Sequence, residues 1–149
     1  MRDTRKLVLA LVVALVTLLA IVNFAALGAP PTDEDGARAA AEHYLKGHAT
    51  GDPEEFRKAF HPDLKLFWVK DGQLAQRTSA DYIAGATGKP ADDEAQRKRR
   101  IASVDVTGDA AVAKVELDYP KAFITDYLSL LKVNGEWKVV NKIFTVRAK

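Results

Sequence analysis

The second half of the chain consists of long segments in which apolar and polar residues alternate, separated by pairs of turn residues. From Ala111 to Tyr119 every second residue is apolar, which is the pattern of a half-buried strand. Similar segments at 101–106, 123–133 and 137–144 are bounded by turns at Gly108–Asp109 and Asn134–Gly135. Consecutive strands of this length predict an antiparallel meander, and because long strands twist, we expect a strongly curved sheet.

The segment before these strands carries the signals of three helices. Thr32, followed by three acidic residues, predicts a helix that ends at Gly51. Asp52–Pro53 begins a second, short helix that Pro62 ends. The remaining signals are a strand at 64–69, a turn at Asp71–Gly72, a helix from 79 to Gly85 or Gly88, and a solvated loop at 89–97. Because the helices come first and the sheet last, the sequence predicts an α+β fold with helices on one face of the sheet.

The first 29 residues have the layout of a secretory signal. Cationic residues at positions 2, 5 and 6 precede an apolar run at 7–22, and the small-x-small rule is met for cleavage before Ala29. The alternative is an uncleaved anchor, since residues 7–27 can span a hydrocarbon core of about 30 Å. Both interpretations export residues 30–149 to the periplasm or the extracellular space. A buried soluble helix is disfavoured because the run has no polar face.

Length and composition limit what the exported part can be. The chain has room for one domain, so we divide it into the targeting segment 1–29, a stiff linker 30–35 and a domain 36–149. Outside the targeting segment, 19 Lys and Arg residues balance 19 Asp and Glu residues. A neutral domain is a poor nucleic-acid partner, and we read the basic run 97–100 as the solvated start of a strand. The absence of cysteine excludes disulfides, thiolate zinc sites and cysteine nucleophiles.

Three segments carry a resemblance to a known family. Residues 60–63 (Phe-His-Pro-Asp), preceded by the two helices, resemble the nuclear transport factor 2-like superfamily. Residues 102–116 and 126–142 are similar to the bacterial branch of that superfamily named for lumazine binding. The resemblance covers roughly residues 36–146.

This resemblance implies a geometry more specifically than a function. It implies a cone-shaped nuclear transport factor 2-like fold, in which a curved antiparallel sheet has three N-terminal helices packed on its concave face. It also implies a cavity between the sheet and the first and third helices, and a homodimer formed through the sheet. The superfamily contains isomerases, dehydratases, cyclases and non-enzymes, so the fold leaves the activity open.

Polar residues next to the predicted cavity are candidates for function. Asn141 shares a strand face with Trp137, so it is either a ligand contact or an amide bonded to nearby backbone. Asp126 and Tyr127 are adjacent and must point to opposite faces of a regular strand. An enzyme on this fold would use Asp126 as the base, with Tyr44 or Tyr127 as the donor.

The chain has three histidines, at positions 43, 48 and 61. His48 lies four residues after Tyr44 on the inner stripe of the first helix, whereas His43 lies off that stripe. Because their spacing does not place both on one helix face, we predict no metal site, and no motif indicates a cofactor. His61, next to Pro62, is either a cap for helix carbonyls or a second candidate base.

Three hypotheses follow for the domain. The favoured one is a ligand-binding or accessory domain without catalysis, holding a small apolar or aromatic ligand and contacting the membrane only through the N-terminal segment. The alternatives are a small isomerase, dehydratase or hydrolase, and an interaction domain whose interior is filled by side chains. The predicted ligand-binding residues are Tyr44, His48, His61, Trp68, Tyr82, Tyr119, Tyr127 and Asn141.

Overall fold

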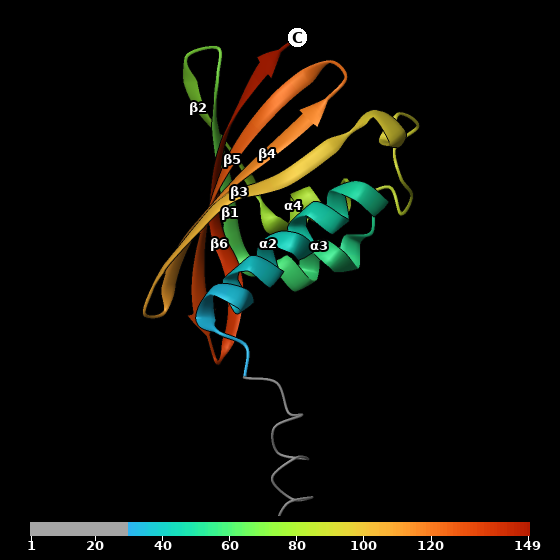
Figure 1. Cartoon of the computed structure of the whole chain (residues 1–149). Coiled ribbons are helices and arrows are strands. Elements are labelled where there is room, and N and C mark those ends of the chain that lie inside the picture. Colours follow the sequence, from blue (N-terminus) through green and yellow to red (C-terminus); the bar gives the residue numbers. More distant parts are fainter. Residues whose placement is uncertain (1–29) are drawn as a thin grey trace, which may run out of the picture. The chain divides into compact units, whose positions relative to one another are not determined.

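The computed structural model describes residues 30–149 (Figure 1). The predicted signal or anchor segment, residues 1–29, lies outside the described residues. Within residues 30–149, no helix combines the length and the apolar character needed to cross a membrane.

Local signals place both ends of the first helix. The helices are α2 (Asp33–Thr50), α3 (Pro53–Ala59), α4 (Ser79–Ala84) and a 3-10 turn, η1 (Glu94–Gln96). The Thr32 side chain accepts a hydrogen bond from the backbone N–H of Asp35, which confirms the predicted cap of α2. Gly51 ends α2 with a φ of 70°, and a Cβ atom there would lie 2.2 Å from the Lys89 carbonyl oxygen. The end of α2 therefore fits closely against the loop that follows α4.

Six strands form one curved sheet. They are β1 (Phe60–Lys70), β2 (Gln73–Thr78), β3 (Lys98–Thr107), β4 (Ala110–Tyr119), β5 (Ala122–Val133) and β6 (Glu136–Ala148). Their order is β2-β1-β6-β5-β4-β3, and every neighbouring pair is antiparallel except β1 and β6, which are parallel. The helices lie together against one face of the sheet, and its upper part extends beyond them (Figure 1). The α+β, cone-shaped fold class is thus confirmed, with one parallel pair that the strand patterns did not reveal.

The predicted end of the second helix at Pro62 was wrong. Helix α3 ends at Ala59, and Pro62 lies inside β1. The hydrogen-bond ladder between β1 and β6 is interrupted between Phe60 and Lys65. Pro62 lies in this gap, so its lack of an N–H removes no bond from the ladder. His61 consequently caps no helix, and its Nδ1 accepts a hydrogen bond from the backbone N–H of Asp63.

The core lies between α2 and the concave face of the sheet. Helix α2 presents small side chains to the sheet, among them Ala37 and Ala41, which are fully buried. The opposing strands contribute a layer of buried branched side chains, namely Val115, Leu117, Leu128, Leu130 and Val139. Because small residues face large ones, the helix approaches the sheet closely. This packing fixes the positions of the polar side chains that α2 carries among the core residues.

Candidate functional site

A bulge in β6 decides which polar side chain enters the interior. Ser129 on β5 pairs with Asn141, but the next residue, Leu130, pairs with Val139, so Val140 is an extra residue in β6. The bulge reverses the inward and outward positions that follow it. Lys142 therefore points into the core instead of Asn141.

Asn141 does not share a face with Trp137, contrary to the prediction. Its side-chain amide donates a hydrogen bond of 3.3 Å to the backbone carbonyl of Lys65. A bond to nearby backbone is what we predicted for Asn141 in a structural role.

Lys142 meets Asp126 and Tyr44 in the interior. Their relative exposures are 3%, 0% and 0%. Lys142 Nζ lies 3.0 Å from Asp126 Oδ1 and donates a 2.6 Å hydrogen bond to the Tyr44 hydroxyl. Tyr44 in turn donates a 2.6 Å hydrogen bond to Asp126 Oδ2. The three side chains form a closed polar cluster, which we call the buried triad.

Aromatic rings surround the Lys142 ammonium group. Its Nζ lies 4.9 Å from the ring centre of Tyr44, 5.5 Å from that of Tyr82 and 4.6 Å from that of Phe144. Burial lowers the pKa of Lys142, and the neighbouring carboxylate of Asp126 opposes that shift. Burial also raises the pKa of Tyr44 well above its usual value, so this hydroxyl keeps its proton.

The buried triad is poorly arranged for acid–base chemistry. A catalytic base needs a carboxylate that can take a proton from a substrate within hydrogen-bond reach. The Asp126 carboxylate is stabilised by an ammonium group and a hydroxyl and is closed to solvent. The enzymatic hypothesis paired Asp126 with Tyr44 correctly in space, but Asp126 has the surroundings of a structural ion pair with Lys142.

A second polar chain runs from the triad's neighbourhood toward the surface. His48 Nε2 lies 2.8 Å from the Tyr82 hydroxyl, and His48 Nδ1 lies 3.3 Å from the Tyr119 hydroxyl. Arg99 Nε donates a 3.0 Å hydrogen bond to the same Tyr119 oxygen, and the guanidinium also pairs with Glu94. Burial holds the pKa of His48 well below its usual value, so its ring is neutral at neutral pH.

An open cleft of about 540 Å³ reaches this chain. His48 of α2, Phe56 of α3 and Tyr82 of α4 form its aromatic wall, with Gly47 beside them. The loop 86–92, Arg77 of β2 and Arg97 complete it. The volume is within the range of about 300–1,000 Å³ that is usual for small-molecule sites.

The cleft is electropositive. Arg77, Lys89 and Arg97 contribute cationic groups, whereas Asp92 is the one carboxylate that lines it. Arg97 is paired with Asp93 at 2.7 Å and stacks over the Tyr119 ring at 4.3 Å. Between residues 30 and 149, neither Arg77 nor Lys89 has an ion-pair partner within 4.0 Å. These two cations are available to a ligand.

A second hollow of about 600 Å³ lies between α3, the start of β1 and α4. Its floor is mainly apolar, with Phe60 and Ile83, and Arg57 and Lys138 contribute cationic groups. None of the predicted site residues lines it. We therefore take the first cleft as the candidate site.

The structure brings together five of the predicted site residues. Tyr44, His48, Tyr82, Tyr119 and Asp126 lie within the two connected polar groups. These residues come from α2, α4, β4 and β5.

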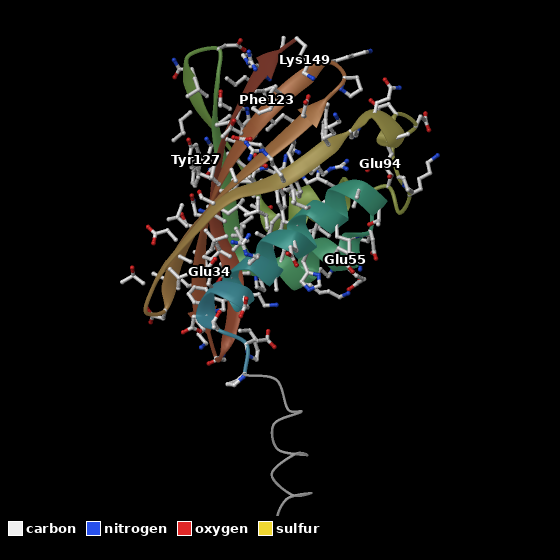
Figure 2. All side chains as sticks on the ribbon, viewed as in Figure 1. Glu34, Glu55, Glu94, Phe123, Tyr127 and Lys149 are labelled. Atoms are coloured by element: carbon white, nitrogen blue, oxygen red, sulfur yellow. The ribbon has the colours of Figure 1, made fainter. Side chains whose placement is uncertain are left out.

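The other predicted residues lie elsewhere. Tyr127 is on the outer face of the sheet, 43% exposed, on the side away from α2 and α3 (Figure 2). Trp68 packs against Phe144 with ring centres 5.4 Å apart, outside the cleft. Asn141 and His61 make the local backbone contacts described above.

The sequence prediction missed Lys142 and Arg99. Arg99 belongs to the run 97–100 that was read as solvated, yet its side chain is only 8% exposed. Its spacing of two residues from Ile101 could have placed it on the inner face. For Lys142, the alternation of apolar and polar residues predicts the outer face, because no local pattern marks Val140 as a bulge.

Comparison with known proteins identifies the family. The profile of the family described as "Putative lumazine-binding" matches residues 32–145. The chain belongs to this family. The resemblance based on residues 102–116 and 126–142 is thereby confirmed.

Similar proteins share the fold at modest identity. An NTF2-like protein of unknown function from Shewanella baltica OS155 is 28% identical, with a TM-score of 0.68 over 80% of this chain and 100% of that one. Another from Silicibacter pomeroyi DSS-3 is 25% identical, with a TM-score of 0.65 over 75% and 93%. The aldolase FrzH of Cladobotryum sp is 23% identical over 113 residues, which are 76% of this chain and 90% of that protein. These likenesses support a small-ligand-binding fold and leave catalysis open.

Proposed function

We propose that this domain binds a small planar ligand that carries carbonyl or carboxylate oxygens, and that it does so without catalysis. The observation that carries the proposal is the open cleft of about 540 Å³ with an aromatic wall and unpaired cations. Lumazine, a pteridine with two ring carbonyls, is named in the family description and fits this class.

The wall of the cleft suits a flat ring. Phe56 and Tyr82 meet edge to face with ring centres 5.3 Å apart, and His48 stands perpendicular to Phe56 at 5.5 Å. Rings that hold each other in this way offer a rigid surface, so a planar ligand loses little through reorganisation of the wall. Arg77 and Lys89 then favour a ligand whose edge is anionic or rich in carbonyl oxygens.

The polar groups near the cleft favour binding over reaction. Both ring nitrogens of His48 are engaged by tyrosine hydroxyls, so no free lone pair remains for a substrate proton. Asp126 is enclosed by its partners in the buried triad. The likeness to an aldolase is the main argument for the enzymatic alternative.

We propose further that the domain acts outside the cytoplasm and forms a homodimer through the outer face of its sheet. The location is supported by the cationic and apolar pattern of residues 1–29. Dimerisation is supported by an exposed apolar group on the outer face, which we call the outer patch, comprising Val112, Tyr127, Leu131 and Ile143.

Titration of the full-length protein with lumazine by isothermal calorimetry tests the binding proposal. Ala91→Trp places an indole in the cleft and is expected to abolish binding, whereas Ala95→Trp, on η1 and outside the cleft, is the matched control. Arg77→Gln is expected to weaken binding and to reduce its dependence on salt. Binding that is equally strong in Ala91→Trp would place the ligand elsewhere, and no binding of lumazine by the wild type would refute this choice of ligand.

A further inference from the structure

The hollow between α3, α4 and the start of β1, which we call the lateral hollow, is separate from the cleft. Within residues 30–149, no residue lines both. Helix α4 presents one face to each: its residues at positions 79, 80, 83 and 84 line the lateral hollow, whereas Tyr82 lines the cleft. A ligand can therefore occupy the lateral hollow while the cleft is filled.

The walls of the lateral hollow suit a hydrocarbon. Its apolar surface comes from Phe60, Pro62, Ile83 and two alanines of α4. Phe60 is held in place because its ring stacks on that of Phe56, with ring centres 5.8 Å apart. The volume of about 600 Å³ is within the usual range for small-molecule sites. Transfer of a hydrocarbon from water into such a hollow is favourable in proportion to the apolar area that is buried.

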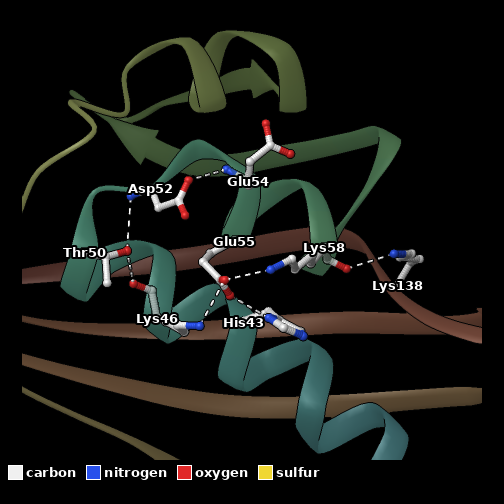
Figure 3. Close-up of polar contacts among 8 residues, drawn as sticks. All are labelled: His43, Lys46, Thr50, Asp52, Glu54, Glu55, Lys58 and Lys138. Carbon is white, nitrogen blue, oxygen red and sulfur yellow. Dashed lines mark hydrogen bonds and ion pairs between the residues drawn. The ribbon is translucent and has the colours of Figure 1, made fainter.

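The charged residues that line the lateral hollow are two cations, and among the described residues no carboxylate joins them. Lys138 Nζ donates a 2.9 Å hydrogen bond to the Lys58 carbonyl and lies 3.3 Å from Glu136 Oε2 (Figure 3). An ammonium group has three N–H donors, so these two contacts leave one for a ligand. Arg57 uses one nitrogen to pair with Glu54, in an exposed contact that costs little to exchange for another anion. These charges favour an anionic ligand.

Ser79 adds an unpaired hydroxyl to the wall of the lateral hollow. The residue is only 3% exposed, and its hydroxyl makes no hydrogen bond within residues 30–149. It is not needed to cap α4, because Thr78 bonds both the N–H and the carboxylate of Asp81. Over the same range, Asp126 Oδ1 is the one side-chain oxygen or nitrogen that is sealed from solvent without a hydrogen bond, so the Ser79 oxygen is open to the hollow. A ligand oxygen that pairs with this hydroxyl relieves the cost of leaving it unbonded in an apolar wall.

We propose that the lateral hollow is a second binding site, which takes a small monocarboxylate with an apolar body, of the class of a medium-chain fatty acid. The apolar body lies against Phe60 and Ile83. The carboxylate pairs with the cations Arg57 and Lys138 and accepts a hydrogen bond from the Ser79 hydroxyl. This inference goes beyond the proposed function and does not depend on it, since the two sites have no lining residue in common.

Octanoate and octan-1-ol are the probes, because they have the same chain length and differ in charge at pH 7. In ¹H–¹⁵N titrations of the full-length protein, we expect octanoate to shift the amide signals of Ala80 and Ile83 with a saturation curve. Octan-1-ol should bind at least fivefold more weakly, and hexanoate about 15-fold more weakly, since each methylene contributes about fourfold. No saturable shift at these amides, or equal affinities for the acid and the alcohol, overturns the inference.

Three tryptophan variants locate the bound acid. Ala84→Trp fills the lateral hollow from an exposed position and should abolish octanoate binding, whereas Ala95→Trp on η1 lines neither site and is the matched control. Ala91→Trp fills the cleft and should leave octanoate binding unchanged. Loss of binding in Ala91→Trp but not in Ala84→Trp would place the acid in the cleft and overturn the inference. Failure of lumazine to bind refutes the proposed function alone, and failure of octanoate to bind refutes this inference alone.

Two further variants test the polar groups. Arg57→Gln should weaken octanoate binding about fivefold and leave octan-1-ol binding unchanged, while Arg38→Gln, taken from an exposed helical pair on α2, should change neither. Ser79→Ala should weaken octanoate binding about fivefold without lowering the melting temperature of the ligand-free protein, because the hydroxyl makes no bond there. A lower melting temperature with unchanged octanoate affinity would show a structural role and overturn the part of Ser79 in binding.

Discussion

Tyr44 and Asp126 lie 82 residues apart in the sequence, and a 2.6 Å hydrogen bond joins them at the centre of the fold. Tyr44 comes from α2 and Asp126 from β5, so the bond ties the helical layer to the sheet. Lys142 from β6 completes the contact with both. The buried triad therefore holds α2, which lines the cleft, against the sheet.

Asp126→Asn should destabilise the protein strongly. The substitution keeps the shape of the side chain but leaves the Lys142 ammonium buried without a carboxylate, and loss of one partner from a buried pair costs about 3–5 kcal/mol. The free energy of unfolding, measured with urea at pH 7, reports the change. The double variant Asp126→Leu with Lys142→Met should regain much of the loss, since no buried charge remains. A loss below about 1 kcal/mol in Asp126→Asn would show that the pair is not buried as described.

Gly47→Ala should also destabilise, although alanine favours helices. A Cβ atom at this position would lie 2.7 Å from the ring of Phe56, which Tyr82 and His48 hold in place. Overpacking of this kind outweighs a gain in helix propensity of about 1 kcal/mol, and we expect a net loss of about 1–2 kcal/mol. The matched control is Gly85→Ala, where the nearest atom lies at 3.4 Å and φ is −80°. A melting temperature of Gly47→Ala that equals or exceeds that of Gly85→Ala would contradict this packing.

Glu55 joins α2 to α3 through three partners (Figure 3). Its carboxylate contacts Lys58 at 2.9 Å, His43 at 2.6 Å and Lys46 at 3.1 Å. These bonds, that of Lys58 first, lower the pKa of Glu55 from 4.5 to about 2. Because the folded-state pKa lies below that of the unfolded chain, the stabilisation is complete above about pH 4.5 and is lost as the pH falls through about 2.

Glu55→Gln should therefore lower the free energy of unfolding at pH 7 by about 1–2 kcal/mol. This is less than the pKa shift alone implies, because solvent screens the charges of the two exposed lysines. The difference from the wild type should shrink between pH 4.5 and pH 2. Glu54→Gln, whose pair with Arg57 is exposed, is the control and should change little. A difference for Glu55→Gln that stays constant down to pH 2 would rule out the carboxylate as its source.

The outer patch should govern association. Ile143 is 51% exposed and pairs across the ladder with Tyr127, so Ile143→Glu places a charge within the apolar group. Light scattering after size-exclusion chromatography should find a dimer for the wild type and a monomer for Ile143→Glu. Leu74→Glu, also at an exposed apolar residue but on β2 away from the patch, should remain dimeric. A monomeric wild type would refute the homodimer, and a monomeric Leu74→Glu would point to the β1–β2 hairpin instead.

Local patterns predicted most of the fold and part of the site. Capping at Thr32, the left-handed glycine at Gly51 and the alternation in 111–119 are properties of neighbouring residues, so they can be read from the sequence. Helical spacing likewise placed His48 on the same stripe as Tyr44, and their rings lie 4.7 Å apart.

The parts that failed depend on pairing between distant segments. The bulge at Val140 arises only from the register in which β6 pairs with β5. It places Lys142 in the interior in place of Asn141. Pro62 fits a strand because the ladder of β1 is interrupted there. The meeting of His48 with Tyr82 and Tyr119 joins residues 34 and 71 positions apart, and no spacing rule reaches that far.

The most direct test of the binding site uses glycine amides as reporters. Gly47, Gly51 and Gly85 line the cleft, whereas Gly108 and Gly135 lie in turns between strands and do not line it. In ¹H–¹⁵N spectra of the full-length protein, we predict that lumazine shifts the first three amide signals with a common saturation curve and leaves the last two unchanged. Saturable shifts confined to Gly108 and Gly135, or no saturable shift at any glycine, would contradict a ligand site in this cleft.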